Sequence, residues 1–354
     1  MRDAPAGQRV RQPRLPIHAL SIILGALAAS CTSTASAPAS RLSAAGVEPN
    51  SPYVVVLGTA QDGGLPQIGC RRECCISARV DPDLRRLVTS ILAVDPAHDR
   101  RYLLDASPHL PEQVELASDF GAPEATDGRP PLFDGIAITH AHLGHYAGLA
   151  YLGREAYGAE TTRVYGTPKL IEYLRVNGPW SLLFDAAHLE AREMAVRQEA
   201  PDETIALAPG ADPDDPGRIQ MLAIEVPHRG EFSDTVGFVL LGPDRKLLYI
   251  PDIDKWERWS VPIEDWIAAV DYALLDGTFF GPDELPGRPM SEIPHPFIVE
   301  SMERFGALPA AERAKIFFTH LNHSNPAANP ASPESRQVRE AGFSILEEGQ
   351  IFPL

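Results

Sequence analysis

Three histidines within six residues follow an apolar run of the chain. Residues 136–139 have the β-branched and apolar composition of a strand, and His140, His142 and His145 come directly after them. Imidazole nitrogens are common ligands of zinc and iron in proteins. This cluster at a strand end therefore predicts a metal site.

The same arrangement recurs at three other places in the chain. Strand-like runs end on His or Asp at 222–226 before His228, at 247–250 before Asp252 and Asp254, and at 316–318 before His320 and His323. Strands would hold these imidazoles and carboxylates rigidly, while the following loops could leave one coordination position open. We therefore expect a metal centre that is assembled from several strand ends.

Length and composition favour one large folded domain carrying that centre. The chain has 354 residues, is 44% hydrophobic and 22% charged, and can therefore bury a sizeable core. Its formal net charge is -17, from 31 basic and 48 acidic residues, which argues against a general nucleic-acid binder. A small-molecule substrate is the expected partner.

Strand-like and helix-like segments alternate from residue 53 onward. Further strands are expected at 53–58, 90–94, 102–105, 236–241 and 273–275, and helices at 146–157, 168–176, 183–197, 296–305 and 309–314. This order predicts an α/β domain over residues 51–354.

The first 50 residues have the composition of an export signal and a tether. Four arginines precede the uncharged run 19–29, which is too short to span a bilayer, and Cys31 follows it. We predict a lipoprotein signal over 1–30 with Cys31 lipidated, and a flexible tether over 31–50. The protein would then be periplasmic or in the cell envelope, held at the outer membrane only by its lipid. An ordinary cleaved signal with an incidental Cys31 is the alternative.

In-order motifs along 53–354 resemble the metallo-β-lactamase superfamily. The matching stretches are 56–67, 139–142, 148–149, 226–229, 251–254, 275–279, 320–322 and 325–326. Within the superfamily the chain is most similar to the pyrroloquinoline quinone biosynthesis protein B family. The resemblance implies an αββα sandwich of two mixed sheets flanked by helices, with a metal site at one edge.

The resemblance also assigns ligands. It implies a first metal held by His140, His142 and His228, a second held by His145 and His320, and a bridging Asp252. Zinc is the expected metal, and iron or manganese are alternatives.

One position departs from the family pattern. The superfamily motif has an Asp before the third histidine of the cluster, where this chain has Gly144. Without that carboxylate we expect about one metal per active site, unless Asp254 or His323 replaces it. On this view Gly144→Asp would raise the count toward two.

Three cysteines suggest a separate structural zinc. Cys70, Cys74 and Cys75 follow the first loop, as a zinc knuckle does in the family, although their spacing differs from the family's Cys-x-Cys-x-x-Cys. Export would favour a disulfide instead, so zinc, a disulfide and free thiols all remain open.

The remaining candidates are acids and one histidine with supporting roles. Asp62 and Asp276 could orient metal ligands from behind. Asp252 and His145 are candidates for handling the attacking water and its proton, and His295 occupies the place of a catalytic histidine in phosphodiesterases of this fold. The resulting hypothesis is an exported metal-dependent hydrolase. An iron-dependent oxygenase and a non-catalytic metal- or ligand-binding lipoprotein are the alternatives.

Overall fold

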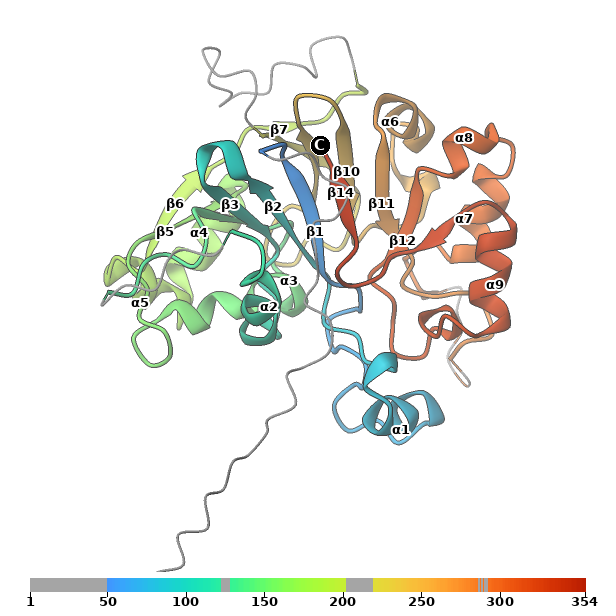
Figure 1. Ribbon diagram of the computed structural model, residues 1–354, viewed down its shortest axis with the longest axis horizontal. Helices are drawn as coiled ribbons and strands as arrows, with labels where there is room; N and C mark the ends of the chain where they lie inside the picture. Colours follow the sequence, from blue (N-terminus) through green and yellow to red (C-terminus); the bar gives the residue numbers. More distant parts are fainter. Residues whose placement is uncertain (1–49, 122–127, 202–218, 286, 288, 290–291) are drawn as a thin grey trace, which may run out of the picture. The chain divides into compact units, whose positions relative to one another are not determined.

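The computed structural model describes residues 50–121, 128–201, 219–285, 287, 289 and 292–354 (Figure 1). All of them belong to one compact unit, Arg41–Leu354. The predicted signal, Cys31 and the predicted tether up to residue 49 lie outside the described residues. Within those residues, no helix has both the length and the apolar character needed to cross a membrane.

Seven strands of the described chain form the first sheet. Their order across it is β14 (Ile351–Pro353), β1 (Tyr53–Gly58), β2 (Ser90–Asp95), β3 (Arg100–Leu104), β4 (Gly135–Ala137), β5 (Thr162–Gly166) and β6 (Leu189–Glu193). From β14 to β3 neighbouring strands run antiparallel, and from β3 to β6 they run parallel. The sheet is therefore mixed.

The second sheet repeats this design with seven more described strands. Their order is β13 (Ser344–Ile345), β12 (Ile316–Thr319), β11 (Tyr272–Asp276), β10 (Lys246–Ile250), β9 (Val236–Leu241), β8 (Gln220–Glu225) and β7 (Val196–Arg197). Strands β10 to β13 run parallel, while β9 is antiparallel to both of its neighbours.

Alternating side chains divide the apolar interior into layers. On β1, Val54 and Val56 join a core between the sheets, whereas Val55 and Leu57 face the outer core of the first sheet. Strands β9 and β10 do the same, with alternate residues in the core between the sheets and in the outer core of the second sheet. A strand buried on both faces must be apolar at every position, which is why these runs lack the polar alternation of a surface strand.

Helices cover the two outer faces. They are α1 (Glu73–Val80), α2 (Leu110–Ala117), α3 (Leu143–Tyr146), α4 (Pro168–Val176), α5 (Trp180–Asp185), α6 (Ile263–Ala269), α7 (Ile298–Phe305), α8 (Ala310–Arg313) and α9 (Pro333–Glu340). Figure 1 shows the strands between α2 to α5 on one flank and α6 to α9 on the other. The expected αββα sandwich of two mixed sheets is thus confirmed.

Two expected helices were wrong in extent or type. The segment 183–197 contains the end of α5 and then the edge strands β6 and β7, because pairing of β6 with β5 outweighs the helix propensity of its Leu, Glu, Ala and Arg residues. The segment 146–157 contains only the last residue of α3, followed by a 3₁₀ helix at Ala147–Leu152. In contrast, α4 begins as expected, with Thr167 capping the amide of Leu170 and Pro168 in the first turn.

Candidate metal centre

The first group of ligand atoms comes from three strand ends. His140 and His142 follow β4, His228 follows β8, and Asp252 follows β10. Asp252 Oδ2 lies 3.3 Å from His140 Nε2, 3.2 Å from His228 Nε2 and 3.9 Å from His142 Nδ1. We call these four residues the first cluster, and the structure brings all four together as ligand atoms within 4.8 Å of one another.

A second group lies directly beside the first. Asp62 Oδ1, from the loop after β1, is 3.7 Å from His145 Nε2 and 3.9 Å from His320 Nε2. Asp252 Oδ2 is also 3.9 Å from His145 Nε2 and 4.0 Å from His320 Nε2. We call Asp62, His145 and His320 the second cluster. The Asp252 carboxylate stands between the two clusters.

The donor atoms suit metal ions. Bonds of about 2.0–2.1 Å place the nitrogen ligands of a tetrahedral zinc about 3.4 Å apart, close to the 2.8 Å between His140 Nε2 and His142 Nδ1 and the 3.2 Å between His228 Nε2 and His142 Nδ1. In the second cluster the Nε2 atoms of His145 and His320 are buried without a hydrogen-bond partner. A buried polar atom without a partner is costly, and a bound cation would remove that cost.

Two threonine–aspartate pairs orient the deepest imidazoles. Thr139 Oγ1 donates to Asp105 at 2.9 Å and accepts from His140 Nδ1 at 3.0 Å. In the same way, Thr278 Oγ1 donates to Asp276 at 2.7 Å and lies 2.9 Å from His320 Nδ1. These bonds leave each Nε2 atom directed at the metal centre.

Sequence reasoning did not single out Asp105. Its carboxylate accepts from His145 Nδ1 at 2.8 Å, from the Thr139 amide at 2.8 Å and from the Tyr249 hydroxyl at 3.3 Å. Asp105 directly follows β3, so the rule that polar residues at strand ends form the site would have found it. Asp105 and His320 both have a positive φ, +66° and +59°, a strained backbone conformation that often occurs at functional sites.

Polar residues near the protein surface orient the first cluster. His228 Nδ1 lies 3.2 Å from Asp254 Oδ1, and Asp254 Oδ2 accepts from Arg258 at 2.6 Å. His142 Nε2 lies 3.0 Å from the exposed Glu231 carboxylate, which sequence reasoning also missed. The structure therefore places Asp254 behind His228 and not at the position left by Gly144.

His295 stands on the other side of Asp252. Its Nδ1 is 2.9 Å from Asp276 Oδ2 and 3.2 Å from Asp252 Oδ1. Its ring centroid is 5.6 Å from that of His228 and 6.2 Å from that of His320. The structure thus brings this candidate to the metal centre, and it brings Asp276 there as the acceptor of His295.

Burial and charge shift the pKa values of these groups in opposite directions. Burial lowers the pKa of His140 well below its usual value, with the neighbouring His145 adding to the effect. Burial also opposes protonation of His145 and His295, but nearby carboxylates, Asp105 for the first and Asp276 for the second, raise both pKa values to about 9. Burial would raise the pKa of Asp252, but the surrounding imidazoles, His228 foremost, hold it well below its usual range.

The cysteines form a separate group. Cys70, Cys74 and Cys75 are free thiols, and their sulfurs lie with a ring nitrogen of His323 within 4.8 Å of one another. The amide of Gln67 donates to Cys75 Sγ at 3.3 Å and that of Arg72 to Cys70 Sγ at 3.4 Å. Burial raises the pKa of the Cys75 thiol to about 12. His323 was expected to support the active site, but the chain turns after His320 and carries its side chain to the cysteines.

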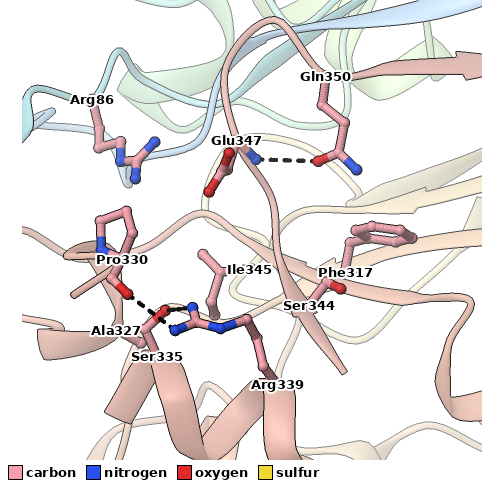
Figure 2. A pocket seen from close by; sticks show the side chains of 10 residues that line it. All are labelled: Arg86, Phe317, Ala327, Pro330, Ser335, Arg339, Ser344, Ile345, Glu347 and Gln350. Carbon is pink, nitrogen blue, oxygen red and sulfur yellow. Dashed lines mark hydrogen bonds between the residues drawn. The ribbon is translucent and has the colours of Figure 1, made fainter. Parts of the chain in front are cut away.

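A cavity of about 240 Å³ lies away from both clusters (Figure 2). It is lined by Arg86, Phe317, Ala327, Pro330, Ser335, Arg339, Ser344, Ile345, Glu347 and Gln350. Figure 2 shows the Arg339 guanidinium hydrogen-bonded to Ser335 and to the Pro330 carbonyl, so two of its nitrogens already have partners within the protein. We assign the chemistry to the metal centre and not to this cavity.

Comparison with known proteins places this site in a family. Residues 100–321 match the family model described as a beta-lactamase superfamily domain. Coenzyme PQQ synthesis protein B of Methylobacterium radiotolerans is 30% identical over 311 residues, which cover 84% of this chain and 98% of the relative.

Solved structures share the fold. The crystal structure of Zn²⁺-bound PqqB from Methylobacterium extorquens matches with a TM-score of 0.67 and 21% identity, over 85% of this chain and all of the neighbour. A diphosphatase from the PhnP family matches with a TM-score of 0.56 and 20% identity, over 86% of this chain and 97% of the neighbour. With its sandwich fold and its clustered strand-end histidines, this chain belongs to the metallo-β-lactamase superfamily and, within it, to the family of coenzyme PQQ synthesis protein B.

Proposed function

We propose that this protein is a metal-dependent hydrolase of a small molecule. The observation that carries the proposal is the position of Asp252 Oδ2, which lies 3.2 to 4.0 Å from ring nitrogens of five histidines. One carboxylate shared by two histidine groups is the arrangement of a two-metal hydrolytic centre. Zinc is the metal that we expect, because the ligands are imidazoles and carboxylates at tetrahedral spacing.

The metal and the protein groups would divide the chemistry. Divalent metal bound here would lower the pKa of a coordinated water toward about 7 and polarise the oxygen under attack. Asp252 would orient the attacking water, and His295 would donate a proton to the departing group through Nε2 while Asp276 holds Nδ1. His145, once a candidate proton relay, is better suited to bind metal because Asp105 fixes its other ring nitrogen.

Exposed apolar side chains beside the first cluster suggest how a substrate binds. Phe232 follows Glu231, is 53% exposed, and stacks on Tyr173 with ring centroids 5.0 Å apart. Leu143, directly after His142, is 61% exposed. These positions favour a substrate with an aromatic or other apolar group. Phe232→Ala should then raise KM about 5- to 10-fold at nearly unchanged kcat, and an unchanged KM would exclude this surface from binding.

Metal analysis and a substrate panel test the activity. Zinc-loaded protein should hydrolyse at least one member of a panel of lactones, thioesters and phosphodiesters. His140→Ala should lose both the first-cluster metal and that activity. An iron-loaded protein that consumes oxygen and hydrolyses nothing in the panel would replace the proposal with an oxygenase.

We further propose a structural zinc on Cys70, Cys74, Cys75 and His323. Four ligand atoms in one group support zinc over a disulfide, since Cys₃His is a common structural zinc set. Cys75→Ser should remove one zinc equivalent and lower thermal stability, while the metal centre keeps its metal. Unchanged zinc content in this variant would contradict the assignment.

Export by a lipoprotein signal is also proposed, on the basic start of the chain, the short apolar run and Cys31. Radiolabelled palmitate should be incorporated into the protein but not into Cys31→Ser. Equal labelling of both would exclude lipidation at this residue.

A further inference from the structure

We infer that this chain binds two metals in its centre and that Asp62 supplies the anionic ligand of the second metal. The superfamily motif takes this ligand from an Asp at the position that is Gly144 here. The inference rests on the proposed metal centre but not on hydrolysis. It reverses the expectation, drawn from the sequence, that Gly144 leaves the second metal weakly bound or absent.

Gly144 and Asp62 compete for the same space. A Cβ atom built on Gly144 would stand 2.0 Å from Asp62 Oδ1, 2.8 Å from Asp62 Cα and 2.9 Å from Asp62 Cγ. Real Cβ atoms essentially never approach another heavy atom this closely, and the Cα atom of Asp62 belongs to the backbone, which cannot rotate away. An Asp at position 144 and the Asp62 carboxylate therefore exclude each other. The glycine makes room for a carboxylate that arrives from another part of the chain.

The Asp62 carboxylate faces the ligand atoms of the second cluster. Its Oδ1 is buried without a hydrogen-bond partner, although the side chain as a whole is 36% exposed. The Nε2 atoms of His145 and His320, 3.7 and 3.9 Å away, are also buried without partners. Three buried polar atoms that face one another without hydrogen bonds raise the free energy of the folded state, unless a ligand binds them. A divalent cation accepts all three, since carboxylate and imidazole are both zinc ligands.

The loop that carries Asp62 is fixed to the strand ends that carry the histidines. Ala60 forms bridges to Val88 and to Leu321, the residue after His320. The Gln61 amide donates to the Leu321 carbonyl at 2.9 Å, and the Leu321 amide donates to Thr59 at 2.8 Å. Asp62 is thus held beside His320 by backbone hydrogen bonds, as a ligand requires.

Removing the Asp62 carboxylate tests the inference. We expect wild-type protein to bind two metals in the centre, measured as zinc equivalents and by competition with a chelator. Asp62→Asn keeps the shape of the side chain but removes its charge, and should weaken the second metal at least about 10- to 100-fold while the first remains. Gly144→Asp should also weaken it, because its Cβ atom would collide with both the backbone and the carboxylate of Asp62.

Matched controls keep the outcome interpretable. Asp83→Asn removes an exposed carboxylate that belongs to neither cluster and should bind metal as wild type does. Unfolding with metal chelated reports whether each variant folds, and Cys75→Ser in every background removes the proposed structural zinc from the count. Two metals bound with wild-type affinity in Asp62→Asn would overturn the inference. This result concerns metal content alone, so it stands apart from a failure to find a hydrolysed substrate.

Discussion

The two clusters of the metal centre share Asp252 but differ in what stands behind their imidazoles. Asp105 and Asp276 hold His145 and His320, directly or through Thr278, and both carboxylates are fully buried. Asp254 and Glu231 hold two imidazoles of the first cluster, and both connect to the surface. The Arg258 side chain that pairs with Asp254 is 60% exposed, and the Glu231 side chain itself is 48% exposed. The second cluster is therefore fixed by the protein interior, and the first partly by groups that water can replace.

The clusters also differ in how directly the sequence specifies them. The first cluster uses the ligand positions that the superfamily motif supplies, whereas the second obtains its carboxylate from a loop more than eighty residues earlier in the chain. A motif reports which side chains one segment provides. It does not report which distant side chain occupies the space that a glycine leaves.

The largest expected effect comes from removing the residue that the clusters share. Asp252→Asn keeps the shape but removes the charge that lies within 4.0 Å of histidines from both clusters. We expect both metals to weaken by more than about 100-fold, and activity to fall with them. Titration with zinc checks this. If only one metal weakens, Asp252 belongs to one cluster and the two are less coupled than their geometry indicates.

A pair of variants compares the supporting carboxylates. Asp105→Ala leaves the Thr139 amide buried without an acceptor, and it leaves the Tyr249 hydroxyl and His145 Nδ1 only the longer contacts to the Thr89 and Thr139 hydroxyls. At about 1–3 kcal/mol for a buried unsatisfied group, with a smaller loss for each weakened hydrogen bond, the free energy of unfolding should fall by about 3 kcal/mol. Asp254→Ala should cost about 1–2 kcal/mol, because Arg258 can turn to water.

Denaturant unfolding in the presence of a chelator measures both variants without a contribution from metal. Metal affinity should also separate the variants. Asp105→Ala should weaken the second cluster about 10- to 100-fold through His145, and the first cluster as well through Thr139 and His140, whereas Asp254→Ala should weaken the first cluster alone. Equal stability losses in the two variants would remove the distinction between an interior-fixed and a surface-fixed cluster.

Much of the fold and of the first cluster could be predicted because both depend on short-range patterns. Apolar runs of five or six residues specify strands that are buried on both faces, and histidines at their ends are visible in the sequence. The residues of the edge strand β6 predict a helix by local propensity, but they form a strand because they pair with β5. This pairing is a tertiary contact that local propensity does not include. His320 and His323 look equivalent in sequence, but the chain turns between them and sends one to the metal centre and the other to the cysteines.

The acids were harder to predict than the histidines. Asp276 ends β11, Asp105 directly follows β3, and Asp62 lies in the loop after β1, and acids at strand ends and in loops are common in any protein. Their roles depend on which atom each carboxylate contacts across the sandwich, and that is set by packing. Asp62 was expected to support a ligand from behind, whereas its Oδ1 lies among the ligand atoms themselves.

The smallest expected effect concerns Glu348, an acid outside both clusters. Its titration gives a pH dependence of folding stability against which any contribution of the clusters is measured. Glu348 accepts from the Leu87 amide and lies near the charge of Arg86, but burial dominates and raises the pKa of its carboxyl to about 7. The unfolded chain, with a glutamate pKa near 4.3, releases this proton first. Between about pH 4.3 and 7 the folded state therefore binds more protons, so stability falls as pH rises through this window and levels off above it.

Glu348→Gln removes this titration and can still accept from the Leu87 amide. Because the Glu348 side chain is partly exposed, we expect its ionisation to cost only about 1–2 kcal/mol, and the variant should gain that much relative to wild type at pH 8 and little at pH 4.5. Denaturant unfolding with metal chelated, repeated across this pH range, measures the difference. If the variant and wild type keep the same pH dependence, the decline must come from other groups, and the histidines of the two clusters become the first place to look for it.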